Sequence, residues 1–183
     1  MKKLSVDEIL SNEDYAAKRD AMRAEVLTVK NRRRIHVGRH LTFLFETTDT
    51  MRYQVQEMLR IEGKDRPEDV AHEVETFNEV LGETGQLGCT LLIEIEDEAE
   101  RDEKLSAWLE LPQHLFLELE DGRRMPAIYD ERQVGDDRLS SVQYLKFDCD
   151  GGRPTALGST LMAHTVRKEL SEDQAAALCE DLQ

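Results

Sequence analysis

Polar side chains that could share one ligand recur on two neighbouring stretches of predicted helix. Thr50, Gln54 and Glu57 follow one another at intervals of four and three residues, so they form one stripe at the shoulder of an apolar helix face. Glu73 holds a similar shoulder position on the next stretch. Carboxylates at the edge of a core need a cation, a hydrogen-bond donor or a proton. If the two helices pair as a hairpin, Gln54, Glu57 and Glu73 converge on one site.

Two interpretations of this site remain open. A metal ion or cationic ligand between Glu57 and Glu73 makes it a functional pocket, whereas arginines from the basic run 32–34 make it a structural ion-pair network. Di-iron sites in helical bundles need a histidine three residues after a glutamate, and neither glutamate has one. No cofactor or catalytic residue is assigned. The further candidate ligand-binding residues are Arg33, Arg34, His40 and Glu46.

The histidines offer a second candidate metal site. His36 and His40 lie on one face of a predicted strand, 35–46. Four residues of strand separate them by about 13 Å, and the ligands of one metal ion lie within about 4 Å of each other. These two histidines therefore share an ion only if the strand bulges at Gly38.

Signatures of common enzyme classes are missing. The chain has no GxxxxGK[ST] phosphate loop, no GxGxxG, no GxSxG and no HExxH, because Thr76 stands where the second histidine after His72-Glu73 would be. Asp148-Cys149-Asp150-Gly151 resembles the start of a calcium loop, but Ser159 replaces the closing glutamate. We interpret that segment as a hairpin turn.

Composition limits the partners. The 183 residues carry a net charge of −15, which disfavours nucleic acid and anionic membrane surfaces and favours a basic partner protein or a cation. No stretch approaches the roughly 20 apolar residues of a membrane span, and Met1-Lys2-Lys3-Leu4 leads into no signal peptide, so we expect a cytoplasmic protein. Cys89, Cys149 and Cys179 are far apart in the chain, and we expect three free thiols.

Hydrophobic periodicity and capping residues predict the helices and strands that would position these side chains. Helices dominate residues 1–82 and strands dominate 83–183, which predicts one α+β domain, 1–183, with a mainly antiparallel sheet and helices packed to one side. The helices next to the candidate site are 50–62 and 67–81. The predicted strands are 35–46, 86–96, 114–120, 123–129, 140–148 and 156–167, with the last two paired and with Pro126 marking an edge strand.

A pattern across the chain resembles an uncharacterised bacterial family, domain-of-unknown-function family 3501. Its core is Phe45-Glu46-x-x-x-Thr50-x-x-x-Gln54-x-x-Glu57-Met58-x-x-x-Glu62. The resemblance continues through Glu73, Asn78, Thr90 to Ile95, Val142-Gln143-Tyr144, Phe147, and Leu170-Ser171-Glu172 to Asp181-Leu182. It departs at His164-Thr165-Val166-Arg167, where the family often has His-Pro-x-Tyr. The resemblance implies a redox or peroxide-stress setting with a redox or iron–sulfur partner protein, because members are encoded beside rubrerythrin-like and iron–sulfur proteins.

Three functions follow as hypotheses. The first is a non-enzymatic cytoplasmic binding or accessory protein that serves such a redox system. The second is a metal- or small-ligand-binding enzyme with a carboxylate-lined site between helices 50–62 and 67–81. The third is a structural subunit whose polar shoulder residues set the helix register. A pocket that contains the shoulder carboxylates favours the second, and a broad apolar surface favours the first or third.

Overall fold

Apolar residues at every second position build the larger of two antiparallel sheets. In its central strand Leu87, Cys89 and Leu91 are buried on one face, and Thr90 and Leu92 point to the other. The computed structural model describes residues 1–183. This sheet, sheet A, has the order β1-β2-β3-β7-β6. Its strands are β1 (Arg34–Val37), β2 (Leu41–Phe45), β3 (Gln86–Ile93), β7 (Val142–Asp148) and β6 (Ile128–Tyr129).

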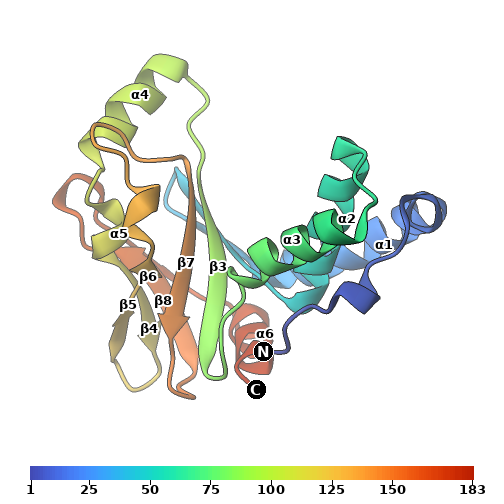
Figure 1. Ribbon diagram of the computed structural model, residues 1–183. Helices are drawn as coiled ribbons and strands as arrows, with labels where there is room; N and C mark the ends of the chain where they lie inside the picture. Colours follow the sequence, from blue (N-terminus) through green and yellow to red (C-terminus); the bar gives the residue numbers. More distant parts are fainter.

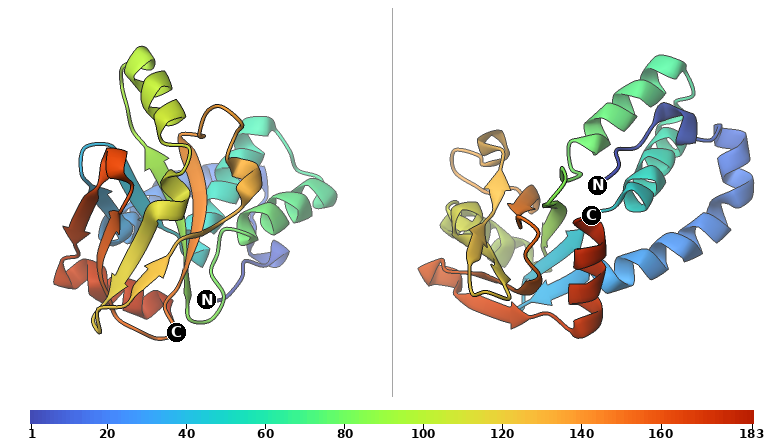
Figure 2. Two further views of the ribbon diagram at one scale, coloured as in Figure 1. Left: turned by 90° about the vertical axis from the view of Figure 1, so that its left-hand side faces the viewer. Right: turned by 90° about the horizontal axis from the view of Figure 1, so that it is seen from below.

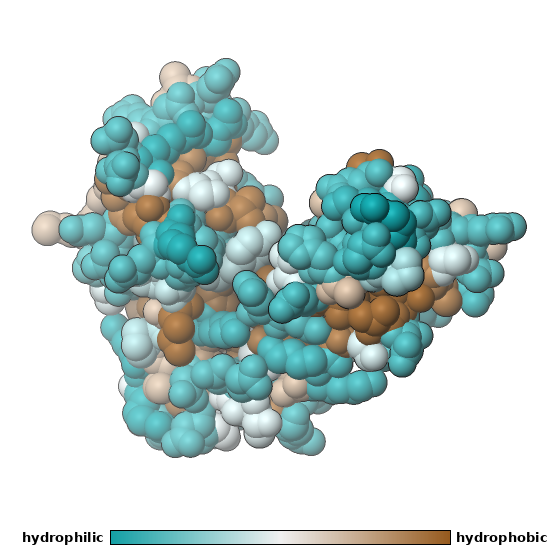
Figure 3. Space-filling model, viewed as in Figure 1, coloured by the Kyte–Doolittle hydropathy of each residue, from teal (hydrophilic) through white to brown (hydrophobic).

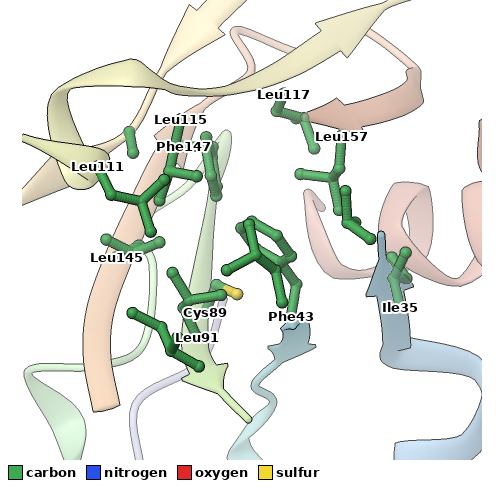
Figure 4. Close-up of a cluster of buried hydrophobic side chains, with 14 of the residues drawn as sticks. Ile35, Phe43, Cys89, Leu91, Leu111, Leu115, Leu117, Leu145, Phe147 and Leu157 are labelled. Atoms are coloured by element: carbon green, nitrogen blue, oxygen red, sulfur yellow. The ribbon is translucent and has the colours of Figure 1, made fainter. Parts of the chain in front are cut away.

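The smaller sheet, sheet B, covers the inner face of sheet A. Its order is β5-β4-β8-β9, with strands β5 (Arg124–Pro126), β4 (Leu115–Leu119), β8 (Pro154–Ser159) and β9 (Val166–Glu169). Figure 4 shows Phe43, Cys89 and Leu145 of sheet A in the cluster that also holds Leu115 and Leu157 of sheet B. This cluster of 24 buried residues is the main core, since burial of apolar surface is the dominant favourable term in folding. Pro126 lies in an edge strand, as predicted.

Three helices stand out to one side of the sheets. They are α1 (Asn12–Arg33), α2 (Thr48–Glu62) and α3 (Pro67–Asn78), and we call them the helical arm (Figures 1 and 2). The arm has small cores of its own, such as the cluster of Leu4, Val55, Leu59 and Val74. The other helices are α4 (Glu98–Ala107), α5 (Leu111–His114) and α6 (Glu172–Asp181), and short 3-10 turns lie at Val6–Glu8, Glu131–Gln133 and Met162–His164.

The arm joins sheet A where backbone passes closely over backbone. A Cβ atom at Gly88 of β3 would lie 2.0 Å from the carbonyl oxygen of Val80 and 2.9 Å from the amide nitrogen of Gly82. Real Cβ atoms do not approach this closely, so only glycine allows the crossing. The close passage of the segment after α3 over β3 therefore requires glycine at position 88.

The predicted α+β class, with antiparallel sheets and helices beside them, is confirmed. The three cysteines are free, as expected. Burial raises the pKa of the Cys89 thiol, and it raises the pKa of Cys149 to about 12. No helix combines the length and the apolar character that crossing a membrane requires.

Four details of the strand prediction are wrong. Residues 123–129 are not one strand, because they are divided between β5 in sheet B and β6 in sheet A. Residues 35–46 form a hairpin rather than one strand, because the chain turns at Gly38, whose φ is 65°. Residues 156–167 are likewise divided into β8 and β9, which pair with each other. The predicted pair 140–148 and 156–167 does not exist, since β7 belongs to sheet A and β8 to sheet B. Alternation predicted which residues are buried, but not which sheet buries them.

Candidate functional site

Glu57 is held by the first helix of the arm. Its Oε1 accepts hydrogen bonds from Arg19 Nε at 2.7 Å and from the Tyr15 hydroxyl at 2.5 Å, and its Oε2 accepts from Arg19 Nη2 at 3.0 Å and Arg60 Nη2 at 3.1 Å. The hydrogen bonds from Arg19, with those from Tyr15 and Arg60, lower the pKa of Glu57 to about 2. The structural interpretation took this cation from the run 32–34, and that part of it is wrong. Arg19 supplies it because α1 packs along α2.

Glu73 has a different cation. Lys64 Nζ donates to its Oε1 at 3.1 Å and also contacts Glu62. The structure therefore does not bring Gln54, Glu57 and Glu73 to one point, and no group of three His, Cys, Asp or Glu side chains is placed to hold a metal ion. The buried amide of α2 is Gln56 rather than Gln54. Its side chain bonds the backbone nitrogen and oxygen of Leu10 at 2.7 and 3.2 Å.

Replacing Glu57 by glutamine tests this ion pair. We expect the free energy of unfolding to fall by about 1–2 kcal/mol, because Arg19 and Tyr15 keep their burial but lose a charged acceptor. Urea denaturation at neutral pH measures the change. Glu68→Gln is the matched control, since its pair with Arg66 is two-thirds exposed on both sides and should contribute nothing measurable. If added divalent metal raised the melting temperature of the wild type but not of Glu57→Gln, the carboxylate would be a metal ligand instead.

Glu46 is the buried carboxylate without an ion pair. It is 4% exposed, and it accepts hydrogen bonds from the hydroxyls of Thr50 at 2.6 Å and Thr90 at 2.7 Å. Burial raises the pKa of Glu46, while the two hydroxyls and the more distant charges of Lys30 and Arg34 oppose that rise. Thr50 also forms the capping box at the start of α2 with Thr47. The four-residue spacing of Glu46 and Thr50 thus places the first turn of α2 where the Thr50 hydroxyl donates to the buried Glu46 carboxylate.

The raised pKa of Glu46 predicts a pH dependence of stability. The native state holds this proton more tightly than the unfolded chain, so stability falls as pH rises from the unfolded value near 4.5 through the raised native value. Glu46→Gln removes that loss, and we expect the variant to match or exceed the wild type at pH 7 and to show no such slope. Glu57 has the opposite sign. Its contribution is present at neutral pH and is lost as pH falls toward 2.

Denaturation curves of wild type, Glu46→Gln and Glu57→Gln across pH 2 to 8 measure both pH dependences in one series. A Glu46→Gln variant that is less stable than the wild type at pH 7 would contradict the assignment of Glu46 as an uncompensated buried acid.

The remaining predicted site residues lie apart. Arg33 is buried against Asp181 of α6, and Nε and Nη2 both lie 2.7 Å from the carboxylate. Arg34 is exposed on β1, and its carbonyl oxygen accepts from Gln174 at 3.3 Å. His40 precedes β2 and Glu46 follows it, so the strand holds them about 20 Å apart. These two candidate ligand-binding residues therefore cannot contact one small ligand.

A cleft that the sequence did not predict lies where α3 approaches sheet A. The surface is notched between the arm and the lobe that carries α4 (Figure 3). A cavity of about 720 Å³ opens at the end of α3, over the outer face of β6 and β7. It is lined by Lys3, Glu75, Thr76, Phe77, Asn78, Glu79, Val80, Glu83, Ile128, Tyr129, Asp130, Gln133, Tyr144, Leu145 and Lys146.

The cleft combines an exposed apolar floor with an acidic wall. Ile128 is 48% exposed and Tyr144 43% exposed, although both are large apolar side chains. Glu75 on α3 and Glu79 directly after it line the wall, and neither forms an ion pair. Lys3 instead pairs with Glu83 and donates hydrogen bonds to the carbonyl oxygens of Asn78 and Leu81. Exposed aromatic floors with charged rims are typical of protein interaction sites.

Lys146 lies on the same floor. Burial lowers its pKa, and the charge of Lys3 acts in the same direction. The outward alternation of Tyr144 and Lys146 along β7 was the available signal in the sequence, but it gave no sign that α3 would stand above them.

Comparison with known proteins finds a family and a structure. Residues 3–182 match the model of the family described as "Protein of unknown function (DUF3501)". The fold is similar to that of a crystal structure of a protein of unknown function from Burkholderia pseudomallei K96243, with a TM-score of 0.91 and 29% sequence identity over 100% of both chains. No curated protein matches the chain.

Proposed function

The chain belongs to the family DUF3501, and we propose that it is a cytoplasmic binding protein whose cleft holds a segment of a partner protein. That segment carries lysine or arginine beside apolar side chains. The observation that supports this is the cleft itself, in which exposed Tyr144 and Ile128 lie next to the unpaired carboxylates Glu75 and Glu79.

The chemistry of the cleft favours a basic amphipathic segment. The apolar floor offers area that a partner can remove from water, and the carboxylates lie at its rim, where charge steers association and selects the partner. The net charge of −15 extends the same preference over the rest of the molecule. A volume of about 720 Å³ admits several side chains of such a segment.

The other hypotheses have less support. An enzyme between α2 and α3 would need the carboxylates of Glu57 and Glu73, which Arg19 and Lys64 neutralise. A redox or iron–sulfur protein as the partner stays a prediction from the family resemblance. The cleft contains no cysteine, so such a partner would be held by contact rather than by thiol exchange.

Peptides of defined composition test the proposal. Three labelled peptides of equal length are compared, one with leucine and lysine, one with glutamate in place of lysine, and one with serine in place of leucine. We expect only the first to bind, with an affinity that falls between about 0.05 and 0.5 M salt. Tyr144→Ser and Glu79→Lys should each weaken binding by about tenfold or more.

Ile61→Ser is the matched control, because Ile61 is 66% exposed but lies outside the cleft. Amide chemical shifts of the labelled wild-type protein locate the contact. Equal binding of the acidic peptide, or shifts that avoid β6, β7 and the end of α3, would overturn the proposal.

A further inference from the structure

Three aromatic rings from distant parts of the chain meet away from the cleft. They are His40 in the turn between β1 and β2, Trp108 at the end of α4, and His164 in the 3-10 turn before β9. The ring centroids of Trp108 and His164 are 4.5 Å apart, those of His40 and Trp108 5.8 Å, and those of the two histidines 6.2 Å. His40 and Trp108 are buried, and His164 is half-buried.

Each histidine presents a ring nitrogen that the fold leaves without a partner. His40 Nδ1 lies 3.4 Å from the carbonyl oxygen of Glu94, and a carbonyl only accepts, so Nδ1 carries the hydrogen and Nε2 keeps its lone pair. His164 Nε2 is buried and has no hydrogen-bond partner. Burial first, then the neighbouring His40 and Lys104, lower the pKa of His164.

The backbone shows where the His164 ring points. A Cβ atom built at Gly38 would lie 4.0 Å from His164 Cε1, the atom bonded to both ring nitrogens. The Cε1 edge of the ring therefore faces the turn at residues 38–40, which also carries His40. Two imidazole rings thus lie side by side, and one of them has a ring nitrogen directed at a backbone carbonyl, as in many histidine metal ligands.

From this arrangement we propose that His40 and His164 bind one transition-metal ion of the zinc and copper class, with water in the remaining positions. Imidazole nitrogen is a preferred ligand of these ions. Rings that share an ion at bonds of about 2.0 Å have centroids roughly 5 to 6.5 Å apart, which includes the observed separation. No third protein side chain completes the set, so the ion should be exchangeable.

One neighbouring charge opposes the ion. Lys104 Nζ lies 5.5 Å from the centroid of the Trp108 ring, and Glu100 lies 3.6 Å from the same ammonium group. Removing this cation by Lys104→Gln should tighten metal binding, because a like charge disfavours the bound ion.

Trp108 makes the site directly observable, since it is the only tryptophan of the chain. Protein without a histidine tag is titrated with Cu(II), which quenches the fluorescence of a nearby indole, and Zn(II) is then added as a competitor. We expect saturable quenching at one equivalent and reversal only by a large excess of Zn(II), because the same ligands bind Cu(II) more tightly. Mg(II), which prefers oxygen ligands, should cause no quenching. His40→Gln and His164→Gln should each raise the dissociation constant about tenfold or more.

His72→Gln is the matched control, because His72 is exposed on α3 and should leave the titration unchanged. If a variant does not fold, proton NMR of the wild type tests the same site. Substoichiometric Cu(II) should broaden the ring proton signals of His40 and His164 before those of the other three histidines. Absent quenching, quenching that persists in both variants, or broadening that begins at His72 or His114 would each overturn the proposal.

Discussion

Replacing Gly88 by alanine is expected to destabilise the fold by about 3 kcal/mol or more, a large part of the stability of an ordinary domain. The added Cβ would lie 2.0 Å from the carbonyl oxygen of Val80, and backbone cannot yield as a flexible side chain can. Either β3 or the connection from α3 must move. Because that connection forms one side of the cleft, we also expect peptide binding to weaken in any variant that still folds.

Gly85→Ala is the matched control for this prediction. Gly85 lies three residues earlier and has a φ of 79°, but a Cβ atom there meets nothing within 4 Å. Its substitution costs only the backbone strain of a left-handed residue, about 1–2 kcal/mol. Thermal and urea unfolding of the two variants separate the effects. A Gly88→Ala variant as stable as Gly85→Ala would show that the backbone at Val80 lies farther from Gly88 than in this structure.

Replacing Asp181 by alanine is expected to cost about 3–5 kcal/mol. Arg33 and Asp181 form a bidentate pair in which each side chain is 8% exposed, so the change removes the buried counter-charge of the guanidinium and leaves only the exposed Glu180, 3.7 Å away. The pair joins the end of α1 to α6, and hydrogen exchange in α6 should rise along with the loss of global stability.

The neighbouring Glu180→Ala is the control for Asp181. Glu180 is 57% exposed and contacts Arg32 at 3.3 Å and Arg33 at 3.7 Å, so its charge is similar but solvated. We expect a change within about 0.5 kcal/mol. A double variant, Arg33→Met with Asp181→Leu, should recover most of the loss, because burying neither charge is less costly than burying one. Equal effects of Asp181→Ala and Glu180→Ala would contradict the buried-pair assignment.

The correct predictions rest on residues that lie close together in sequence. The helices around 50–62 and 67–81 depend on neighbours a few positions away. Alternation along 86–96 identified the buried face of β3 for the same reason. The α+β class followed from the order of these elements, and the residues from Phe45 to Glu62 pointed to the family that the match over residues 3–182 shows.

The prediction of the candidate site was wrong where the interacting residues are far apart in sequence. Shoulder positions correctly indicated that Glu57 and Glu73 need a cation, but helical periodicity says nothing about which helix packs alongside, and Arg19 and Lys64 supplied the charges. The turn at Gly38 was hidden because alternation continues through a tight hairpin whose two strands bury the same face.

No local signal in the sequence showed that the two walls of the cleft, or the two histidines, would lie side by side. Tyr144 and Glu79 are brought together by the crossing over Gly88, and His40 meets His164 through the packing of sheet B on sheet A. Hydrophobic pattern determines which side of each element is buried, because that choice depends on residues one helical turn or two strand positions away. Which surfaces then face each other depends on long-range strand pairing and backbone crossings, and the sites of this protein arise from those contacts.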